Sequence, residues 1–412
     1  MHEPTIWKAV VTSARNSLLG NIHFMQLWAG QAISFVGDAV SMVALVILVV
    51  QLTGSASAVG GALVARLLPT FASPLFGVLA DRFDRRVVLV ASDLVRATLV
   101  LGLVFARDLV VIYGLVFLMG FARTLFNPTI RAAFPSVVGE GDLARANSFI
   151  GGAFSASVMV GPTLGGLLVA TVGVNGAFLL DAATYMISAA LLFRIPLPRP
   201  QRENEEVGVF RELRSGLSYL AGARVPLVVM MGAFLTVLAT DLATPAEVFL
   251  AKGTFGAGDV GYGLLVGLWG GGMVLGSALV AVLGGRLKLI PIYFLGIFVW
   301  ALALAGTGLS PAFVLALGMV ALAGAANGVD NVVTDTILQR RVSDAFLGRV
   351  FSVKYLGYGA GEALAYPAGG LLVDSLGPRS TFLLSGIATA VAALVVLLVL
   401  TAGASARDVS SK

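Results

Sequence analysis

Twelve apolar runs of bilayer-crossing length constrain this chain more than any other feature of its sequence. A transmembrane helix needs about 20 consecutive, mainly apolar residues, and short polar loops separate the runs. Charged residues make up only 12% of the chain, about half of the share usual in soluble domains. The sequence therefore predicts an all-α polytopic membrane protein with these spans: Phe24–Gln51, Ala58–Leu79, Val87–Phe105, Leu109–Asn127, Phe149–Thr171, Gly176–Phe193, Pro226–Phe249, Val260–Leu283, Leu289–Leu309, Phe313–Leu338, Val350–Val373 and Thr381–Thr401.

Lysine and arginine are divided unequally between the two sets of loops that these spans define. The loops opposite the N-terminus hold only Arg107, Lys252 and Arg379. Under the positive-inside rule, both termini are therefore expected in the cytoplasm. Because the cations line one membrane face in short loops, the net charge of +5 does not indicate a nucleic-acid partner. The loops on the side of the N-terminus hold twenty: Lys8, Arg15, Arg82, Arg85, Arg86, Arg131, Arg145, Arg194, Arg199, Arg202, Arg211, Arg214, Arg224, Arg286, Lys288, Arg340, Arg341, Arg349, Arg407 and Lys412.

The longest polar stretch lies between the sixth and seventh spans. Within it, Phe210, Leu213, Leu217 and Leu220 recur at helical spacing, which predicts an amphipathic helix on the membrane surface. We therefore expect five parts: a cytoplasmic N-terminal segment (1–23), a six-helix bundle (24–193), a cytoplasmic linker (194–225), a second six-helix bundle (226–401) and a cytoplasmic tail (402–412).

An internal repeat indicates that the two bundles are homologous. Gly165–Leu180 reads GGLLVATVGVNGAFLL and Gly369–Leu384 reads GGLLVDSLGPRSTFLL, an offset of 204 residues. The same offset pairs Arg145 with Arg349 in charged loops, where chance alignment of apolar residues is no explanation. Two pseudo-symmetric halves related by an axis along the membrane normal are one of the plans of secondary transporters.

The loop between the second and third spans carries Gly77, Asp81, Arg82 and Arg86. It resembles the signature loop of the major facilitator superfamily, although Asp84 replaces the second glycine of that pattern. The resemblance implies a gating role, in which Asp81 accepts hydrogen bonds across the interface between the halves. The alternative is that the charges only anchor the loop at the membrane surface.

The fifth span carries Gly161, Pro162, Gly165 and Gly166. This is similar to the proline-glycine motif of antiporters in the same superfamily, with Ser157 where the pattern has glycine. Proline removes a backbone hydrogen bond and glycine allows close helix packing. The alternative is ordinary glycine packing, since the repeat places a second glycine pair in the eleventh span.

Two further stretches, Thr124–Val138 and Thr336–Ser352, look like the drug:proton antiporter branch that contains macrolide efflux proteins and the enterobactin exporter. Together with Phe178–Leu192, they extend the resemblance over nearly the whole chain. It implies the major facilitator fold, with a cavity lined by the first, fourth, seventh and tenth helices. It says little about the cargo.

Charged residues inside the spans are costly, which makes each of them a candidate for function with a named partner. Similar depth along neighbouring helices suggests that Asp38 pairs with Arg66. The same argument predicts a structural ion pair of Asp335 with Lys354. Asp93 and Arg96 lie three residues apart on one helix face, which predicts a second structural pair, and Arg123 at a similar depth is expected to join it. Asp181 is placed with this structural group.

Glu362 and Asp241 have no cation at their depth. An unpaired buried carboxylate is expected to be protonated much of the time, as proton coupling requires. The candidates for proton coupling are Asp38, Glu362 and Asp241. The candidates that line a substrate cavity are Arg66, Asn327, Asp330, Asn331 and Tyr358.

These observations predict a secondary active transporter that exports small amphipathic compounds, such as a drug-like molecule or a siderophore, by alternating access. The expected partners are the substrate, protons and the bilayer, with the proton gradient as energy source and no cofactor. We expect a monomer in the bacterial cytoplasmic membrane. A flippase for lysophospholipid or another lipid, an uptake carrier and a non-transporting sensor remain alternatives.

Two other classes are disfavoured by the residues themselves. His2 and His23 both precede the first span, so no imidazole is expected in the cavity and no metal site is predicted. The chain has no cysteine, which leaves a membrane enzyme without the usual nucleophile–base sets. We therefore expect no catalytic residues.

Overall fold

The computed structural model describes residues 18–72, 83–197, 209–284 and 288–410. This part of the chain is helical and contains no β-strand. Gly77, Asp81 and Arg82 of the predicted gating loop lie outside the described residues, whereas Arg86 lies in the first turn of a helix.

The first half of the chain forms one helical bundle. Its helices are α2 (Ile22–Thr53), α3 (Ala56–Leu67) with a 3-10 turn (Leu68–Ala72), α5 (Arg85–Phe105), α6 (Leu109–Val138) and α7 (Leu143–Phe193). The last of these contains two spans, because Gly173 has non-helical angles (φ 78°, ψ 173°) that divide it. A positive φ of this size is readily adopted only by glycine.

The second half begins with α8 (Val209–Gly222), the helix that the spacing of apolar residues in the linker predicts. The bundle that follows consists of α9 (Arg224–Thr240), a 3-10 turn (Asp241–Ala243), α10 (Ala246–Phe249), a π turn (Leu250–Thr254), α11 (Gly258–Leu283), α12 (Leu289–Leu309), α13 (Phe313–Arg341), α14 (Asp344–Leu376) and α15 (Pro378–Ser410). The last helix continues past residue 401, where the sequence predicts the tail to begin.

The described helices account for twelve spans. Nine segments are long and apolar enough to cross a membrane, and α7 among them crosses twice. The shorter apolar α3 and the more polar α14 complete the number. The seventh span differs from the uninterrupted helix that the sequence predicts, because it breaks at Asp241 and resumes at Ala246. Pro245 lies in this break, and proline cannot donate the hydrogen bond that continues a helix.

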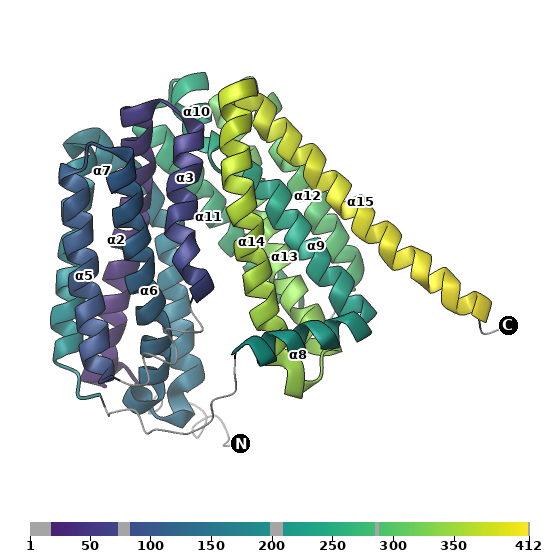
Figure 1. Ribbon diagram of the computed structural model, residues 1–412, viewed down its shortest axis with the longest axis horizontal. Coiled ribbons are helices and arrows are strands. Elements are labelled where there is room, and N and C mark those ends of the chain that lie inside the picture. The colour runs from purple at the N-terminus through teal and green to yellow at the C-terminus, as the bar shows by residue number, and fades with distance from the viewer. Residues whose placement is uncertain (1–17, 73–82, 198–208, 285–287, 411–412) are drawn as a thin grey trace, which may run out of the picture.

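The two bundles lie side by side and meet along α3 and α14 (Figure 1). These helices approach each other at the end of the molecule opposite α8, which Figure 1 shows at the lower edge. A hydrogen bond from Thr163 on α7 to the carbonyl of Gly263 on α11 (3.4 Å) also joins the halves. We refer to these two ends as the α8 end and the opposite end.

Glycine brings the backbones of the two halves into contact. A Cβ added to Gly263 on α11 would lie 2.4 Å from the carbonyl oxygen of Pro162 on α7. One added to Gly60 on α3 would lie 2.3 Å from the carbonyl oxygen of Tyr366 on α14. Such contacts leave no room for any other side chain. The backbones of the two halves are therefore in direct contact at these two positions.

Candidate transport site

A cavity of about 380 Å³ lies inside the second bundle. Four carboxylates line it: Asp241, Glu247, Asp330 and Glu362. No lysine or arginine is among its described lining residues. We call it the acidic cavity. Its volume suits a small organic molecule.

The break in the seventh span directs two of these carboxylates to the acidic cavity. Asp241 forms the C-cap of α9, and its backbone carbonyl accepts a hydrogen bond from the amide of Thr244 (3.2 Å). Glu247 lies in α10, two residues after Pro245. Asp241 is within electrostatic range of Glu247 and Glu362. The three acids therefore form one group of like charge.

The predicted polar patch of the tenth span lines the same cavity. Asn327, Asp330 and Asn331 on α13 and Tyr358 on α14 are all lining residues. The amide of Asn331 donates to Asn327 Oδ1 (3.1 Å), and the Thr334 hydroxyl donates to Asp330 Oδ1 (3.5 Å). The structure thus brings these four candidates together with Asp241 and Glu362.

Glu247 was not singled out in the sequence analysis. It lies inside the predicted seventh span and two residues after a proline. The rule that selected Asp241, a charge within an apolar run, could also have found it.

Aromatic rings complete the lining of the acidic cavity. Trp269, Trp300, Tyr366 and Phe382 line it together with Tyr358. Such rings offer apolar contact and a face that attracts cations. The site therefore combines negative charge with aromatic surface.

The ion pair between Asp335 and Lys354 is present behind this lining. The Lys354 ammonium, which is only 2% exposed, donates to Asp335 as their similar depth predicts. It also lies 4.9 Å from the ring centroid of Tyr358. Lys354 therefore contacts Tyr358, a residue that lines the acidic cavity. A purely structural role for this pair stays a prediction.

A second cavity of about 310 Å³ lies between the halves. Asp38, Arg66 and Arg123 of the first bundle line it, opposite Tyr262 and Trp269 of α11. We call it the interface cavity. Trp269 lines both cavities. The two sites are therefore neighbours on either side of α11.

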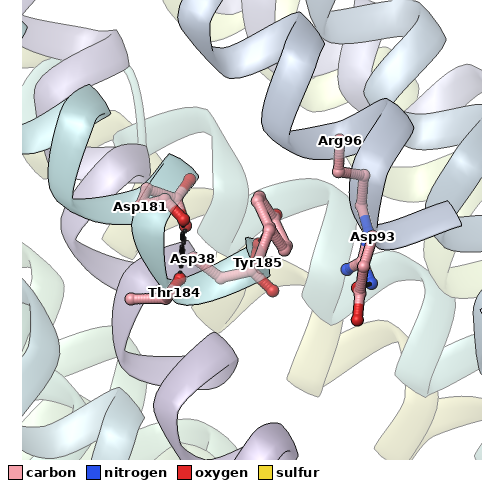
Figure 2. Close-up of polar contacts among 6 residues, drawn as sticks. All are labelled: Asp38, Asp93, Arg96, Asp181, Thr184 and Tyr185. Atoms are coloured by element: carbon pink, nitrogen blue, oxygen red, sulfur yellow. Dashed lines mark hydrogen bonds and ion pairs between the residues drawn. The ribbon is translucent and has the colours of Figure 1, made fainter. Parts of the chain in front are cut away.

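Asp38 does not form the ion pair with Arg66 that the sequence predicts. Its carboxylate accepts a hydrogen bond from the hydroxyl of Tyr185 on α7 (Figure 2). Arg66 and Arg123 lie within electrostatic range of Asp38, but neither forms an ion pair with a described residue. Depth along a helix fixes the height of a side chain but not its direction around the axis, and direction decides this contact.

The buried pair of α5 is present, but without its predicted third member. Arg96 donates to Asp93, and both side chains are buried. The Arg96 guanidinium also lies 4.4 Å and 4.5 Å from the ring centroids of Phe126 and Tyr185. Arg123 lines the interface cavity with Asp38 of α2 and Arg66 of α3 instead of joining this pair.

The sequence places Asp181 with the structural group. In Figure 2, Asp181 lies on the side of Asp38 that is away from the Asp93–Arg96 pair. It accepts a hydrogen bond from the hydroxyl of Thr184 (3.3 Å) and is fully buried. Tyr185, one turn further along α7, separates it from the Asp93–Arg96 pair. These polar groups form a buried cluster beside the interface cavity.

The glycine-proline motif of the fifth span packs in two directions. Gly161 and Gly165 contact α2, since an added Cβ would lie 2.5 Å from Ala39 Cβ and 3.1 Å from Val40 Cα. Gly166 contacts α11 of the other half, since an added Cβ would lie 2.9 Å from Gly263 Cα. Pro162 lies inside a helical segment and lines the interface cavity. An antiporter role for the motif stays a prediction.

Arg86 is the described member of the predicted gating set. Its guanidinium donates to the carbonyl of Phe193 (3.5 Å) and lies 5.5 Å from the centroid of that ring. The contact stays within the first bundle. A gating role for this loop stays a prediction.

Two six-span bundles with membrane-embedded cavities inside and between them define a multi-pass membrane transporter. The sequence profile of the family described as transmembrane secretion effector matches residues 14–412. The chain belongs to this family of the major facilitator superfamily, as the resemblance predicts.

Characterised relatives of similar length agree with this assignment. The chain is 25% identical over 379 residues to macrolide efflux protein A of Streptococcus pyogenes, covering 89% of this chain and 93% of the relative. It is 28% identical over 341 residues to the enterobactin exporter EntS of Escherichia coli O1:K1 / APEC, covering 79% and 78%. The fold also matches the crystal structure of the nucleoside transporter NupG with a TM-score of 0.75, covering 92% of this chain and 99% of that one at 14% identity.

Proposed function

We propose that this transporter exports small amphipathic compounds in exchange for protons, by alternating access. It acts as a monomer in the bacterial cytoplasmic membrane with both termini in the cytoplasm. The observation that carries the proposal is the acidic cavity, where four carboxylates meet without a cation among the described lining residues. The relatives named for macrolide efflux and enterobactin export support the direction of transport.

The negative charge of the acidic cavity couples substrate binding to proton release. Several carboxylates in one cavity of low dielectric cannot all be ionised without a large cost, so they take up protons when no cation is present. A cationic or polar substrate that enters from the cytoplasm stabilises the ionised form and displaces a proton. Proton binding from the other side then releases the substrate.

Asp241 and Glu362 are the residues assigned to this exchange, with Glu247 as a third. Asp241 lies within electrostatic range of both Glu362 and Glu247. Asp38 differs from these three carboxylates in its surroundings, because Arg66, Arg96 and Arg123 provide neighbouring positive charge. We therefore assign Asp38 to charge balance in the interface cavity, and proton exchange to the acidic cavity.

The energy available is sufficient for export. One proton moving inward across 100 mV supplies about 2.3 kcal/mol from the electrical term alone. At about 1.4 kcal/mol per decade, this sustains a roughly fifty-fold concentration gradient. A pH gradient adds to it.

The packing of the two halves supports alternating access from a state closed at one end. With the predicted orientation, the opposite end faces the outside, so the structure corresponds to a state closed toward the exterior. Opening requires separation of α3 from α14 and of α7 from α11. The glycine contacts described above are the surfaces that must part.

The proposal is tested by measuring drug efflux and proton uptake together in proteoliposomes. Glu362→Gln and Asp241→Asn remove a titratable group while keeping side-chain shape, and each is expected to abolish proton-driven efflux. Asp344→Asn serves as the control, because Asp344 is exposed at the first turn of α14, outside both cavities. Undiminished proton-driven efflux in the Glu362→Gln/Asp241→Asn double variant would remove the acidic cavity from the coupling mechanism.

A further inference from the structure

The two cavities carry opposite kinds of unpaired charge. In the acidic cavity, Asp330 is only 4% exposed and forms no ion pair with a described residue, since Lys354, which lies within its electrostatic range, is paired with Asp335. In the interface cavity, Arg66 and Arg123 likewise lack an ion pair within the described part of the chain. Charges left without partners inside a membrane protein are costly and mark sites of function. Each cavity therefore lacks a complementary group that a ligand could supply.

The geometry places these opposite charges within reach of one molecule. Val266 and Trp269 of α11 line both cavities, so the two cavities adjoin along this helix. Glu362 and Asp241 face one side of this boundary, and Arg123 lies on the other. The combined space, about 380 Å³ and about 310 Å³, is that of a drug-sized ligand.

The interface cavity retains positive charge even though Asp38 lies in it. Asp38 is the one carboxylate among the described lining residues of this cavity, it lies within electrostatic range of both Arg66 and Arg123, and it already accepts the hydrogen bond from Tyr185. Asp181, which lies within electrostatic range of Arg66, does not line the cavity. The guanidinium of a second arginine is left to a ligand. A planar guanidinium binds a carboxylate through two parallel hydrogen bonds, which gives directional recognition of an acid.

Aromatic side chains line the path between the charges. Trp269 lies at the boundary, Phe35 and Phe154 lie in the interface cavity, and Tyr366 lies in the acidic cavity. Phe35 and Phe154 stack edge to face with centroids 5.5 Å apart. The surface between the charged groups is thus suited to an aromatic or aliphatic body.

We propose that the substrate is amphoteric: an amphipathic molecule with a basic amine that binds in the acidic cavity and a carboxylate that binds Arg123 and Arg66 in the interface cavity. This inference rests on the proposed function, and narrows its substrate class. It assigns Arg123, which the sequence places among structural ion pairs, to substrate recognition. Simple organic cations and multiply charged acids each satisfy only one of the two cavities.

Three matched probes test this inference: phenylalanyl-phenylalanine, which is a zwitterion, its C-terminal amide, which is a cation, and its N-acetyl derivative, which is an anion. Binding to the purified full-length protein is measured by calorimetry at neutral pH. A hydrogen-bonded charge contributes about 1.5–3 kcal/mol, so the zwitterion is expected to bind at least about tenfold more tightly than either derivative.

Variants locate each charge. Arg123→Gln is expected to weaken binding of the zwitterion about tenfold and binding of the amide far less. Glu362→Gln is expected to weaken binding of the zwitterion and to leave binding of the N-acetyl derivative unchanged. Arg340→Gln and Asp344→Asn are matched controls that change charge at exposed positions outside both cavities. Elution as a single species and an unchanged thermal transition identify the variants that fold.

Three results would overturn the inference. The first is that the amide binds as tightly as the zwitterion. The second is that Arg123→Gln weakens binding of all three probes equally. The third is that none of the three probes binds. The proposed function fails separately. If the zwitterion binds with the expected charge dependence but moves without protons, proton exchange is wrong and the inference stands. If only the amide is bound and moves in exchange for protons, the exporter stands and the inference is wrong.

Discussion

Asp374, at the end of α14, accepts a hydrogen bond from the hydroxyl of Ser55, which precedes α3 in the other half (2.9 Å). The same carboxylate accepts hydrogen bonds from the backbone amides of Ala56 (2.7 Å) and Ser57 (3.0 Å). It therefore caps the N-terminus of α3 from the opposite bundle. A carboxylate is stabilised there by the unpaired amides and by the helix dipole. This contact closes the end of the transporter that we place at the exterior.

Asp374→Asn is expected to weaken this closure. Loss of a charged N-cap costs about 0.5–2 kcal/mol, so the population open at this end rises roughly fivefold. The measurement is the distance distribution between spin labels at Leu52→Cys and Leu376→Cys, both exposed and on different halves. The chain has no cysteine of its own, which makes the labelling specific.

Asp108→Asn is the matched control for that substitution. Asp108 caps α6 through the amides of Val110 and Val111, entirely within the first bundle. It should leave the distance distribution unchanged. Equal distributions for Asp374→Asn and the unsubstituted protein would show that the cap does not hold the halves together.

The same contact predicts a dependence on pH. Burial raises the pKa of Asp374, but the hydrogen bonds from Ser57, Ala56 and Ser55 outweigh it and hold the pKa below the usual value of 3.8. Because the pKa is lowered in the closed state, the contact is complete above the usual pKa and is lost as the pH falls below it. The spin-label distances should be constant at pH values above the usual pKa of 3.8 and lengthen as the pH falls below it. A change of equal size in Asp374→Asn would assign the effect to other groups.

Gly263→Ala is expected to prevent full closure between α7 and α11. The new Cβ would lie 2.4 Å from the carbonyl oxygen of Pro162, and overpacking of this kind costs about 1–3 kcal/mol. The open population at this end should therefore rise, as measured by the same spin labels. Gly114→Ala is the control, since nothing lies within 4 Å of its added Cβ. Similar distances in both variants would contradict the close packing of these helices.

The Lys354–Asp335 pair predicts an asymmetric response to substitution. Asp335→Asn leaves the buried ammonium of Lys354 without its partner and should lower thermal stability. The loss should fall below the roughly 3–5 kcal/mol of a fully buried pair, because Asp335 is 35% exposed. Adding Lys354→Met should restore much of it, as a thermal unfolding assay would show. A double variant less stable than Asp335→Asn alone would argue against a structural ion pair.

The sequence was sufficient for the fold because its strongest signals are local. Apolar length and the 204-residue repeat predicted the spans and the two halves, and α8 followed from four apolar residues at helical spacing. The break at Asp241 was missed, although Pro245 marks it. The contacts between buried polar side chains were predicted less well. Lys354 meets Asp335, but Asp38 meets Tyr185 rather than Arg66, because helix rotation and tilt are set by tertiary packing that helical depth does not describe.

The central claim, that carboxylates of the acidic cavity exchange protons for substrate, is tested most directly by one flux measurement. Proteoliposomes containing the protein and a pH-sensitive dye are loaded with phenylalanyl-phenylalanine, its amide or an amphipathic drug, and an inward proton gradient is imposed. Proton exchange in the acidic cavity predicts substrate efflux with simultaneous proton uptake, and loss of both in Glu362→Gln. Efflux that continues at the same rate after an uncoupler collapses the gradient, with no substrate-dependent proton movement, would contradict it.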